Sequence, residues 1–329
     1  MGKAKDYIPA LKYGHKIMPE DLAGMLGLPH VGNIYYVDPT NGSDTANSGT
    51  SQNDALKTLR IAEDKTTDNN HDVVVIVPGE VGSGSGTAET ANITWDKDNT
   101  HLIGSSAPVA LSNRARIITT TDSVDPCITI SGHGNTFRNV QFATYEDSND
   151  VLINLTGDRN YFENVHFAGI GSATCGDDST ARCLAMSGAA ENRFVNCTFG
   201  MDTIARSTTN ATVEFASAST RNIFEYCRFI MWADNVGPNH ILFTGSSAID
   251  RWIQFDNCTW YAFWTNDADK VTHVMDLAAQ TATGHVLMTG RQIMVGFDDW
   301  EATDSDRIFF EPATATANAI GIGINPSVS

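Results

Sequence analysis

The sequence predicts an all-β protein whose strands wind into a parallel solenoid. Its strand-like segments are rich in Val, Ile, Phe and Thr, and clusters of Gly, Asn, Asp and Ser separate them. One frame of residues recurs at 135–142, 160–167, 192–199, 222–229 and 252–260. The phenylalanine at its third or fourth residue is Phe137, Phe162, Phe194, Phe224 and Phe255, at spacings of 25, 32, 30 and 31 residues. A long period with unequal insertions is typical of a parallel β-solenoid, whose insertions become loops.

Composition excludes several other classes of protein. The chain has 329 residues, of which 41% are hydrophobic and 18% charged, so it is not a disordered chain. Its formal net charge of −18 argues against a nucleic-acid partner, because phosphate contacts need clustered Lys and Arg. No apolar run approaches the roughly 20 residues of a membrane-spanning helix, so we expect no membrane partner.

A second apolar strand precedes each copy of the frame. These strands lie at 127–130, 151–155, 183–186, 212–215 and 241–243. A weaker pair at 273–277 and 285–288 continues the series, and 100–104 resembles an earlier winding with a degraded frame. We therefore expect six or seven stacked windings.

The frame also predicts a bend in each winding. Val140 and Phe142 differ by two positions and face one side of a strand, whereas Phe137 precedes Val140 by three, so the inward parity breaks between them. Asn139 lies at this break, and Asn tolerates the left-handed backbone that a bend needs. Its equivalents are Asn164, Asn196, Tyr226 and Asn257. Stacked windings would align these amides in a ladder and place two inward columns, Val140, Val165, Cys197, Cys227, Cys258 and Phe142, Phe167, Phe199, Phe229, Trp260.

The apolar ends of a solenoid need covering, and the sequence before the repeats supplies a cap. It begins with a strand at 34–37, followed by a Gly/Asn/Ser-rich loop and a short helix over about 54–62. The segment 71–80, HDVVVIVPGE, then reads as a buried strand that ends in Pro-Gly.

These cap motifs carry a family resemblance. They are YVDP at 36–39, GSD at 42–44, KTL at 57–59 and the DV…PG strand at 72–79. With the repeats, residues 34–295 resemble the right-handed β-helix superfamily typified by pectate lyases. The resemblance implies a single-stranded right-handed parallel β-helix with an N-terminal arm and a short capping helix. It says little about function, since this fold hosts lyases, hydrolases and inert spikes.

Residues 1–33 precede the cap as an arm. Positions 1–17 hold four Lys and one Asp, a net charge of +3, so the remaining residues carry −21. A disordered, soluble N-terminus is one interpretation. The arm also resembles that of tailed-phage structural proteins, which implies docking on another virion protein such as the major capsid protein. The residues expected to bind are Lys3, Lys5, Tyr7, Ile8, Leu11, Lys12, Tyr13 and Lys16.

The densest aromatic cluster lies at 252–264. Half of it belongs to the repeat frame, which leaves Tyr261, Phe263 and Trp264 for partner binding. They would stack on sugar rings or bury at a subunit interface, and the interface is favoured. The resemblance implies a homo-oligomer, a trimer. The segment 296–329, small-residue-rich with alternating Ile, reads as a terminal extended segment.

Candidate chemistry is sparse. Gly132-His133-Gly134 is similar to a polygalacturonase motif, but the acidic and basic partners of that motif are missing, so a turn is expected. The pair 177–178 and the loop 38–44 are acidic enough to consider Ca²⁺ or a catalytic acid, with a solvated loop as the simpler interpretation. His166 lies between inward residues and is expected at the surface or an interface.

The six cysteines form no zinc-binding pattern, and we expect free, buried thiols. Cys175 and Cys183 are the pair that merits a test for a disulfide bridge.

The sequence therefore predicts no catalytic, cofactor or metal site. It predicts a phage virion structural protein, a capsid-associated decoration or stabilising protein or a short spike, assembled in the host cytoplasm. The alternative is a carbohydrate-binding or carbohydrate-cleaving tailspike, which would need carboxylates from successive windings in one groove.

Overall fold

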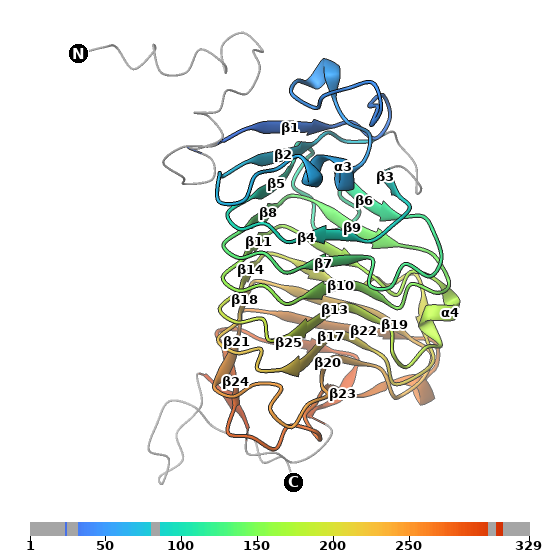
Figure 1. The fold of residues 1–329 in the computed structure, drawn as a ribbon. Coiled ribbons are helices and arrows are strands. Elements are labelled where there is room, and N and C mark those ends of the chain that lie inside the picture. Colours follow the sequence, from blue (N-terminus) through green and yellow to red (C-terminus); the bar gives the residue numbers. More distant parts are fainter. Residues whose placement is uncertain (1–23, 25–31, 80–85, 302–306, 312–329) are drawn as a thin grey trace, which may run out of the picture.

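The protein is described from a computed structural model that covers residue 24 and residues 32–79, 86–301 and 307–311. Its strands form three parallel sheets that stack as rungs along one axis (Figure 1). Within each repeated winding the chain passes through sheet A, then sheet B, then sheet C, as β8, β9 and β10 illustrate. This arrangement confirms the predicted parallel β-helix.

Sheet A is the longest sheet. Its ten strands, in order, are β1 (Ile34–Val37), β2 (Val73–Ile76), β5 (His101–Gly104), β8 (Thr136–Arg138), β11 (Tyr161–Glu163), β14 (Arg193–Val195), β18 (Ile223–Glu225), β21 (Trp252–Asp256), β24 (His285–Thr289) and β27 (Ile308–Phe310). More windings are present than the six or seven expected, because the first strands are apolar throughout and lack the repeat frame.

Sheets B and C complete the windings. Sheet B contains β3 (Thr87–Glu89), β6 (Arg116–Thr119), β9 (Gln141–Thr144), β12 (His166–Ala168), β15 (Thr198–Phe199), β19 (Arg228–Ala233), β22 (Thr259–Trp264) and β25 (Ile293–Val295), with β16 (Ala205–Arg206) beside β19. Sheet C contains β4 (Ile93–Trp95), β7 (Ile128–Ile130), β10 (Val151–Leu155), β13 (Arg182–Ser187), β17 (Ala211–Ser217), β20 (Asn239–Phe243), β23 (Val271–Asp276) and β26 (Phe297–Glu301). Strands β26 and β27 lie beyond residue 295, within the segment predicted to be extended.

The core consists of stacked identical side chains. Phe137, Phe162, Phe194, Phe224 and Phe255 stack in register, with ring centroids 4.5 to 4.9 Å apart. The second aromatic column and the Val/Cys column are buried as the frame predicts. These columns confirm that equivalent positions recur because successive windings lie directly over one another.

Helices are few and short. α3 (Leu59–Asp64) packs near the N-terminal end against the first windings, where a capping helix was predicted, although it begins five residues later than expected (Figure 1). α4 (Ala173–Gly176) lies in the loop before β13, and two 3₁₀ turns cover Gln52–Asp54 and Asp267–Asp269. In the described ranges, none of these helices has the length and apolar character to cross a membrane.

Candidate functional site

The bend between sheets A and B has the predicted left-handed backbone. Asn139, Asn164, Asn196, Tyr226 and Asn257 all have φ between 51° and 58°. The predicted amide ladder is only partly realised: Asn164 Nδ2 donates to Asn139 Oδ1 at 2.8 Å, and Asn113 Nδ2 does the same. The ladder ends there because the next equivalents bond elsewhere; Asn196, for example, accepts from Arg228.

A second, buried column of asparagines precedes sheet A and was missed. Its members are Asn135, Asn160, Asn192 and Asn222, all 1% exposed or less. Each side-chain oxygen accepts the backbone N–H of the residue one winding earlier, as Asn192 Oδ1 does from Asn160 N at 2.8 Å. The signal was present, since Asn is the first residue of four copies of the frame. This column stabilises the turns by satisfying backbone donors that are closed to water.

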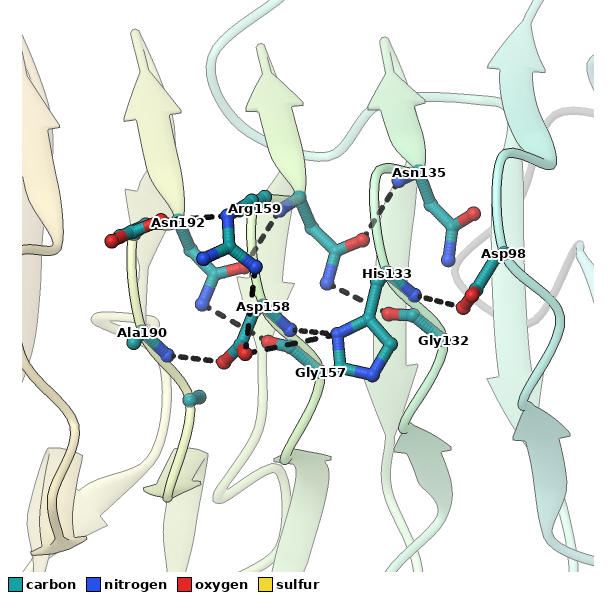
Figure 2. A network of polar contacts seen from close by, with 12 residues as sticks. Asp98, Gly132, His133, Asn135, Gly157, Asp158, Arg159, Ala190 and Asn192 are labelled. Atoms are coloured by element: carbon teal, nitrogen blue, oxygen red, sulfur yellow. Dashed lines mark hydrogen bonds and ion pairs between the residues drawn. The ribbon is translucent and has the colours of Figure 1, made fainter. Parts of the chain in front are cut away.

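His133 lies in the outermost part of the same turns (Figure 2). Its Nδ1 accepts the backbone N–H of Asp158 at 2.8 Å, while the Asp158 carboxylate is 3.9 Å away. The Asp158 carboxylate in turn accepts the backbone N–H of Ala190, and the backbone N–H of His133 donates to Asp98. A catalytic His-Asp pair would need Nδ1 to donate to the carboxylate. His133 therefore has the predicted role of a turn residue that links windings.

The acidic residues of the cap also have structural roles. Asp44 accepts the backbone N–H groups of Lys57 and Thr58, at 2.8 and 3.1 Å, and so fixes the approach to α3. Asp38 accepts two N–H groups of its own turn. Buried Glu89 accepts the N–H of Leu59 at 2.7 Å, and burial raises the pKa of this carboxyl. These contacts explain the spacing of the cap motifs without a calcium ion.

The acidic pair 177–178 belongs to the loop before β13. The Asp177 carboxylate accepts the hydroxyl of Ser207, one winding further on. Asp178 Oδ1 accepts the N–H and the hydroxyl of Thr180 at 2.6 Å, and these bonds lower the pKa of Asp178. In the described ranges, no three His, Cys, Asp or Glu side chains gather in an arrangement that would hold a metal ion.

The expectation for His166 was wrong, because its side chain is only 4% exposed. It does point away from the core, but Nδ1 accepts the N–H of Ser112 at 3.3 Å and Nε2 lies 2.9 Å from the carbonyl of Gly200. Loops from two other windings therefore cover it. Burial lowers the pKa of His166 to about 4.

All six cysteines are free and buried, as expected. Cys175 and Cys183, the pair considered for a bridge, are not joined. Burial raises the pKa of the Cys183 thiol, and Cys175 Sγ lies near backbone carbonyls of the preceding loop.

A cavity of about 530 Å³ lies against sheet C, and it is a candidate for a small-molecule site. Its lining comes from strands β13, β20 and β23, the loops that precede them, and the loop before β17: Ser179, Arg182, Thr209, Val236, Gly237, Asn239, Leu242, Thr272, His273 and Asp276. Hydroxyls, an amide and both charge signs thus share a space large enough for a sugar unit or two.

Arg182 is tightly held at one end of this cavity. Its Nε donates to Glu214 at 2.8 Å, and Nη1 donates to the carbonyls of Ser179 and Ala181. These contacts leave Nη2 as the nitrogen available to a ligand. On β23, three strands along the same sheet, His273 Nδ1 is buried and has no hydrogen-bond partner among the described residues.

The sequence reasoning also missed a pair of carboxylates on this face. Glu214 is in register with Leu242, and Leu242 is in register with Asp276, so the two acids lie on the outer side of sheet C two strands apart. That corresponds to about 10 Å between their Cα atoms. The sequence does not reveal this pair, because Glu214, Leu242 and Asp276 share no motif and insertions of unequal length separate their strands.

The aromatic residues of 252–264 divide between two faces. Tyr261 and Phe263 point outward from β22 and are 37% and 43% exposed. Trp264 is half-buried and its Nε1 lies 3.4 Å from Asp267 Oδ1, so it does not share their exposure. Trp232 on β19 lies beside Phe263, with ring centroids 5.6 Å apart, and extends the patch. The eight predicted arm residues, from Lys3 to Lys16, lie outside the described ranges.

Neither the protein-family models nor the curated proteins contain a match to this chain. Solved structures do match. Pectin methylesterase PemA from Erwinia chrysanthemi aligns with a TM-score of 0.52 and 17% identity over 81% of this chain and 80% of the enzyme. Pectate lyase Pel9A aligns with a TM-score of 0.54 and 16% identity over 79% of this chain and 62% of that chain. ORF18 of Geobacillus virus E2 aligns with a TM-score of 0.43 and 13% identity over 89% of this chain and 63% of that chain.

At such low sequence identity, a structural match shows a shared fold but does not show a shared activity. The alignments with PemA and Pel9A each extend over about four fifths of this chain, which includes most of its three stacked sheets. The chain is a parallel β-helix protein with the fold of the pectate lyases and pectin methylesterases.

Proposed function

We propose that this chain is a structural protein of a tailed-phage particle, either a decoration or stabilising protein of the head or a short spike. The observation that carries the proposal is the outward-facing aromatic surface of sheet B, formed by exposed Tyr261 and Phe263 with half-buried Trp232 beside them. Large rings of this kind are enriched where proteins bury surface against one another. The N-terminal arm would hold the rod on the particle, as its resemblance implies.

Ion pairs between neighbouring windings support a scaffold role. Arg138 bonds to Glu163, Arg193 to Glu225, and Arg182 to Glu214, each across one winding of the helix. The more exposed of these pairs, such as Arg193–Glu225, add little stability singly. Together with the stacked rings, they fix the relative positions of successive windings. A contact surface on this scaffold loses little conformational entropy on binding.

A particle-binding experiment tests the proposed anchoring role of the N-terminal arm. The full chain and a variant that lacks residues 1–31 would be mixed with particles depleted of this protein and sedimented. We expect the full chain to pellet with the particles and the truncated chain to stay in the supernatant with an unchanged circular dichroism spectrum. Equal pelleting of both chains contradicts the anchoring role. Cryo-electron microscopy of the intact particle then tests the assignment itself, because a particle without density for the rod would refute it.

A second candidate function rests on the cavity over sheet C. Its polar lining, together with Glu214 and Asp276 on one face, favours a carbohydrate-binding or carbohydrate-cleaving spike. The structural likeness to pectin methylesterase and pectate lyase directs the choice of substrates to test.

This candidate is tested with pectin and polygalacturonate of defined chain length. Calorimetry would measure binding, methanol release would report de-esterification, and absorbance of unsaturated products would report lyase activity. Asp276→Asn and His273→Gln are the informative variants, and Asp177→Asn serves as the control in a neighbouring loop. Binding or turnover that only the first two variants lose supports the candidate. An inert wild-type chain contradicts it for these substrates.

A further inference from the structure

The outer face of sheet B is buried over its N-terminal half and becomes exposed toward its C-terminal strands. Ile118, Ala143 and Ala168 lie in one register column on this face and are at most 3% exposed. Met201 and Ile204, from the loop after β15, pack with them. Further along the same face, Tyr261 and Val295 are paired in register but 37% and 42% exposed. The outward side chains Tyr261, Phe263 and Val295 of β22 and β25 therefore remain exposed among the described residues.

This half forms one apolar surface, which we call the aromatic face. It consists of the outward residues of three adjacent strands, Ile230, Trp232, Tyr261, Phe263 and Val295. Tyr261, Phe263 and Val295 are exposed, Trp232 is half-buried, and Ile230 is only 9% exposed at its edge. Ile230 pairs with Tyr261 and Trp232 pairs with Phe263, so the side chains stand in two rows. The strands of this face carry no charge between its two borders.

Opposite charges lie on the two borders of the aromatic face. Arg228, at the start of β19, and Arg291, just before β25, lie on the border where the strands begin. Asp234 follows β19 and Asp267 follows β22, so both lie on the border where the strands end. Because the strands are parallel, the two arginines share one border and the two aspartates share the other. None of these four groups forms an ion pair within the described ranges.

We propose that the aromatic face binds the aromatic face of a second copy of this chain across a two-fold axis. An axis that runs along the stack of windings, perpendicular to the strands, reverses the strand direction of the partner, so the basic border of each copy lies over the acidic border of the other. The contact is then complementary in charge at both edges and apolar at its centre, as stable interfaces are. This pairing uses the same surface that supports the proposed function, but it is tested with the purified chain alone, so a failure of particle binding leaves the pairing standing.

Sedimentation equilibrium of the full chain tests the pairing. We expect a mass of two chains for the wild type and one chain for Phe263→Asp, with Kd weakened by at least tenfold. Leu111→Asp is the matched control, because Leu111 is 43% exposed in a loop far along the chain from the aromatic face, and it should remain a dimer. A wild-type monomer overturns the proposal. So does a mass of three chains, which would favour the trimer implied by the family resemblance.

Charge exchange tests the two-fold geometry. The variant Arg228→Glu/Arg291→Glu has two acidic borders and should be monomeric, and Asp234→Arg/Asp267→Arg has two basic borders and should be monomeric as well. An equimolar mixture of these two variants should form a heterodimer, and a chain that carries all four substitutions should pair with itself again. Unfolding curves confirm that each variant is folded. Failure of both rescues in folded variants would refute the two-fold arrangement.

Discussion

Phe162 stacks on Phe194 of the next winding, with ring centroids 4.7 Å apart and planes inclined by 8°. The two residues are 32 positions apart in the chain, yet their strands β11 and β14 place them in direct register. Near-parallel rings at this distance match the spacing of neighbouring strands. The pair shows how the repeat frame of the sequence becomes the core of the protein.

Removal of one ring from this column should be costly. Phe194 contacts Phe162 and Phe224 on either side and is fully buried. Phe194→Ala should lower the free energy of unfolding by about 3–5 kcal/mol, since the stacked neighbours have little freedom to fill the cavity. Chemical denaturation measures the change. Phe194→Leu, which should cost about 1.5 kcal/mol or less, keeps the test usable if the alanine variant does not fold. A loss below about 1 kcal/mol for Phe194→Ala would contradict the packing.

Tyr226 offers a stabilising substitution. It has φ of 53° and an exposed side chain at a bend position where four equivalents are Asn. Left-handed backbone costs most residues about 1–2 kcal/mol, and Asn tolerates it. Tyr226→Asn should therefore raise the free energy of unfolding by about 1 kcal/mol. Tyr226→Ala is the control and should bring no such gain, because Ala keeps the backbone penalty. Equal stability of the two variants would argue against the bend as the cause.

The buried asparagine column should be sensitive to loss of a single amide. Asn192 accepts the N–H of Asn160 and donates to the carbonyl of Gly157 at 3.1 Å. Asn192→Ala leaves both backbone groups without a partner and should cost about 1–3 kcal/mol for each group that stays dry. Thermal unfolding would show the loss. The control Asn196→Gly keeps the bend and should have a much smaller effect.

Acid should destabilise the fold through His166. Its folded-state pKa of about 4 lies below the ordinary value of 6.5, so the unfolded chain binds the proton more readily. The stabilisation from neutral His166 is complete above pH 6.5 and is lost as the pH falls toward 4, with a total of about 3 kcal/mol. His101, with a pKa also lowered to about 4 by burial, acts in the same direction.

Unfolding melts at pH 7 and pH 4.5 measure this dependence. His166→Gln keeps a donor and an acceptor but does not titrate, so it should lose less stability than the wild type over this range. Identical losses in both proteins would show that His166 does not carry the effect.

The core was readable from the sequence because each winding must satisfy the same packing at the same position. Phe137 to Phe255 and the bend at Asn139 follow from parity and spacing alone. The same regularity was present in the column of Asn135, yet a polar residue in a strand-flanking turn reads as ordinary loop composition. The burial of this column depends on how successive windings stack, which the sequence of a single turn does not show.

The loops and outer faces were less predictable, because they depend on which insertion folds over which strand. His166 has the outward parity expected of it, but the loop at Ser112 and the carbonyl of Gly200 cover it. The cavity over sheet C likewise combines residues from four windings between Ser179 and Asp276. Trp264 was grouped with Tyr261 and Phe263, although it lies at the end of β22 on the other parity.

The stacking of windings is tested most directly by distances between spin labels on the outer face of sheet A. Arg138, Val195, Asp256 and Thr289 lie in one register column, and labels at the last three would each be paired with one at Arg138. These pairs are separated by two, four and five windings, so double electron–electron resonance, with continuous-wave spectra for the shortest pair, should give backbone separations near 10, 19 and 24 Å, about 4.8 Å per winding. Distances that do not rise with the number of windings would contradict the β-helix.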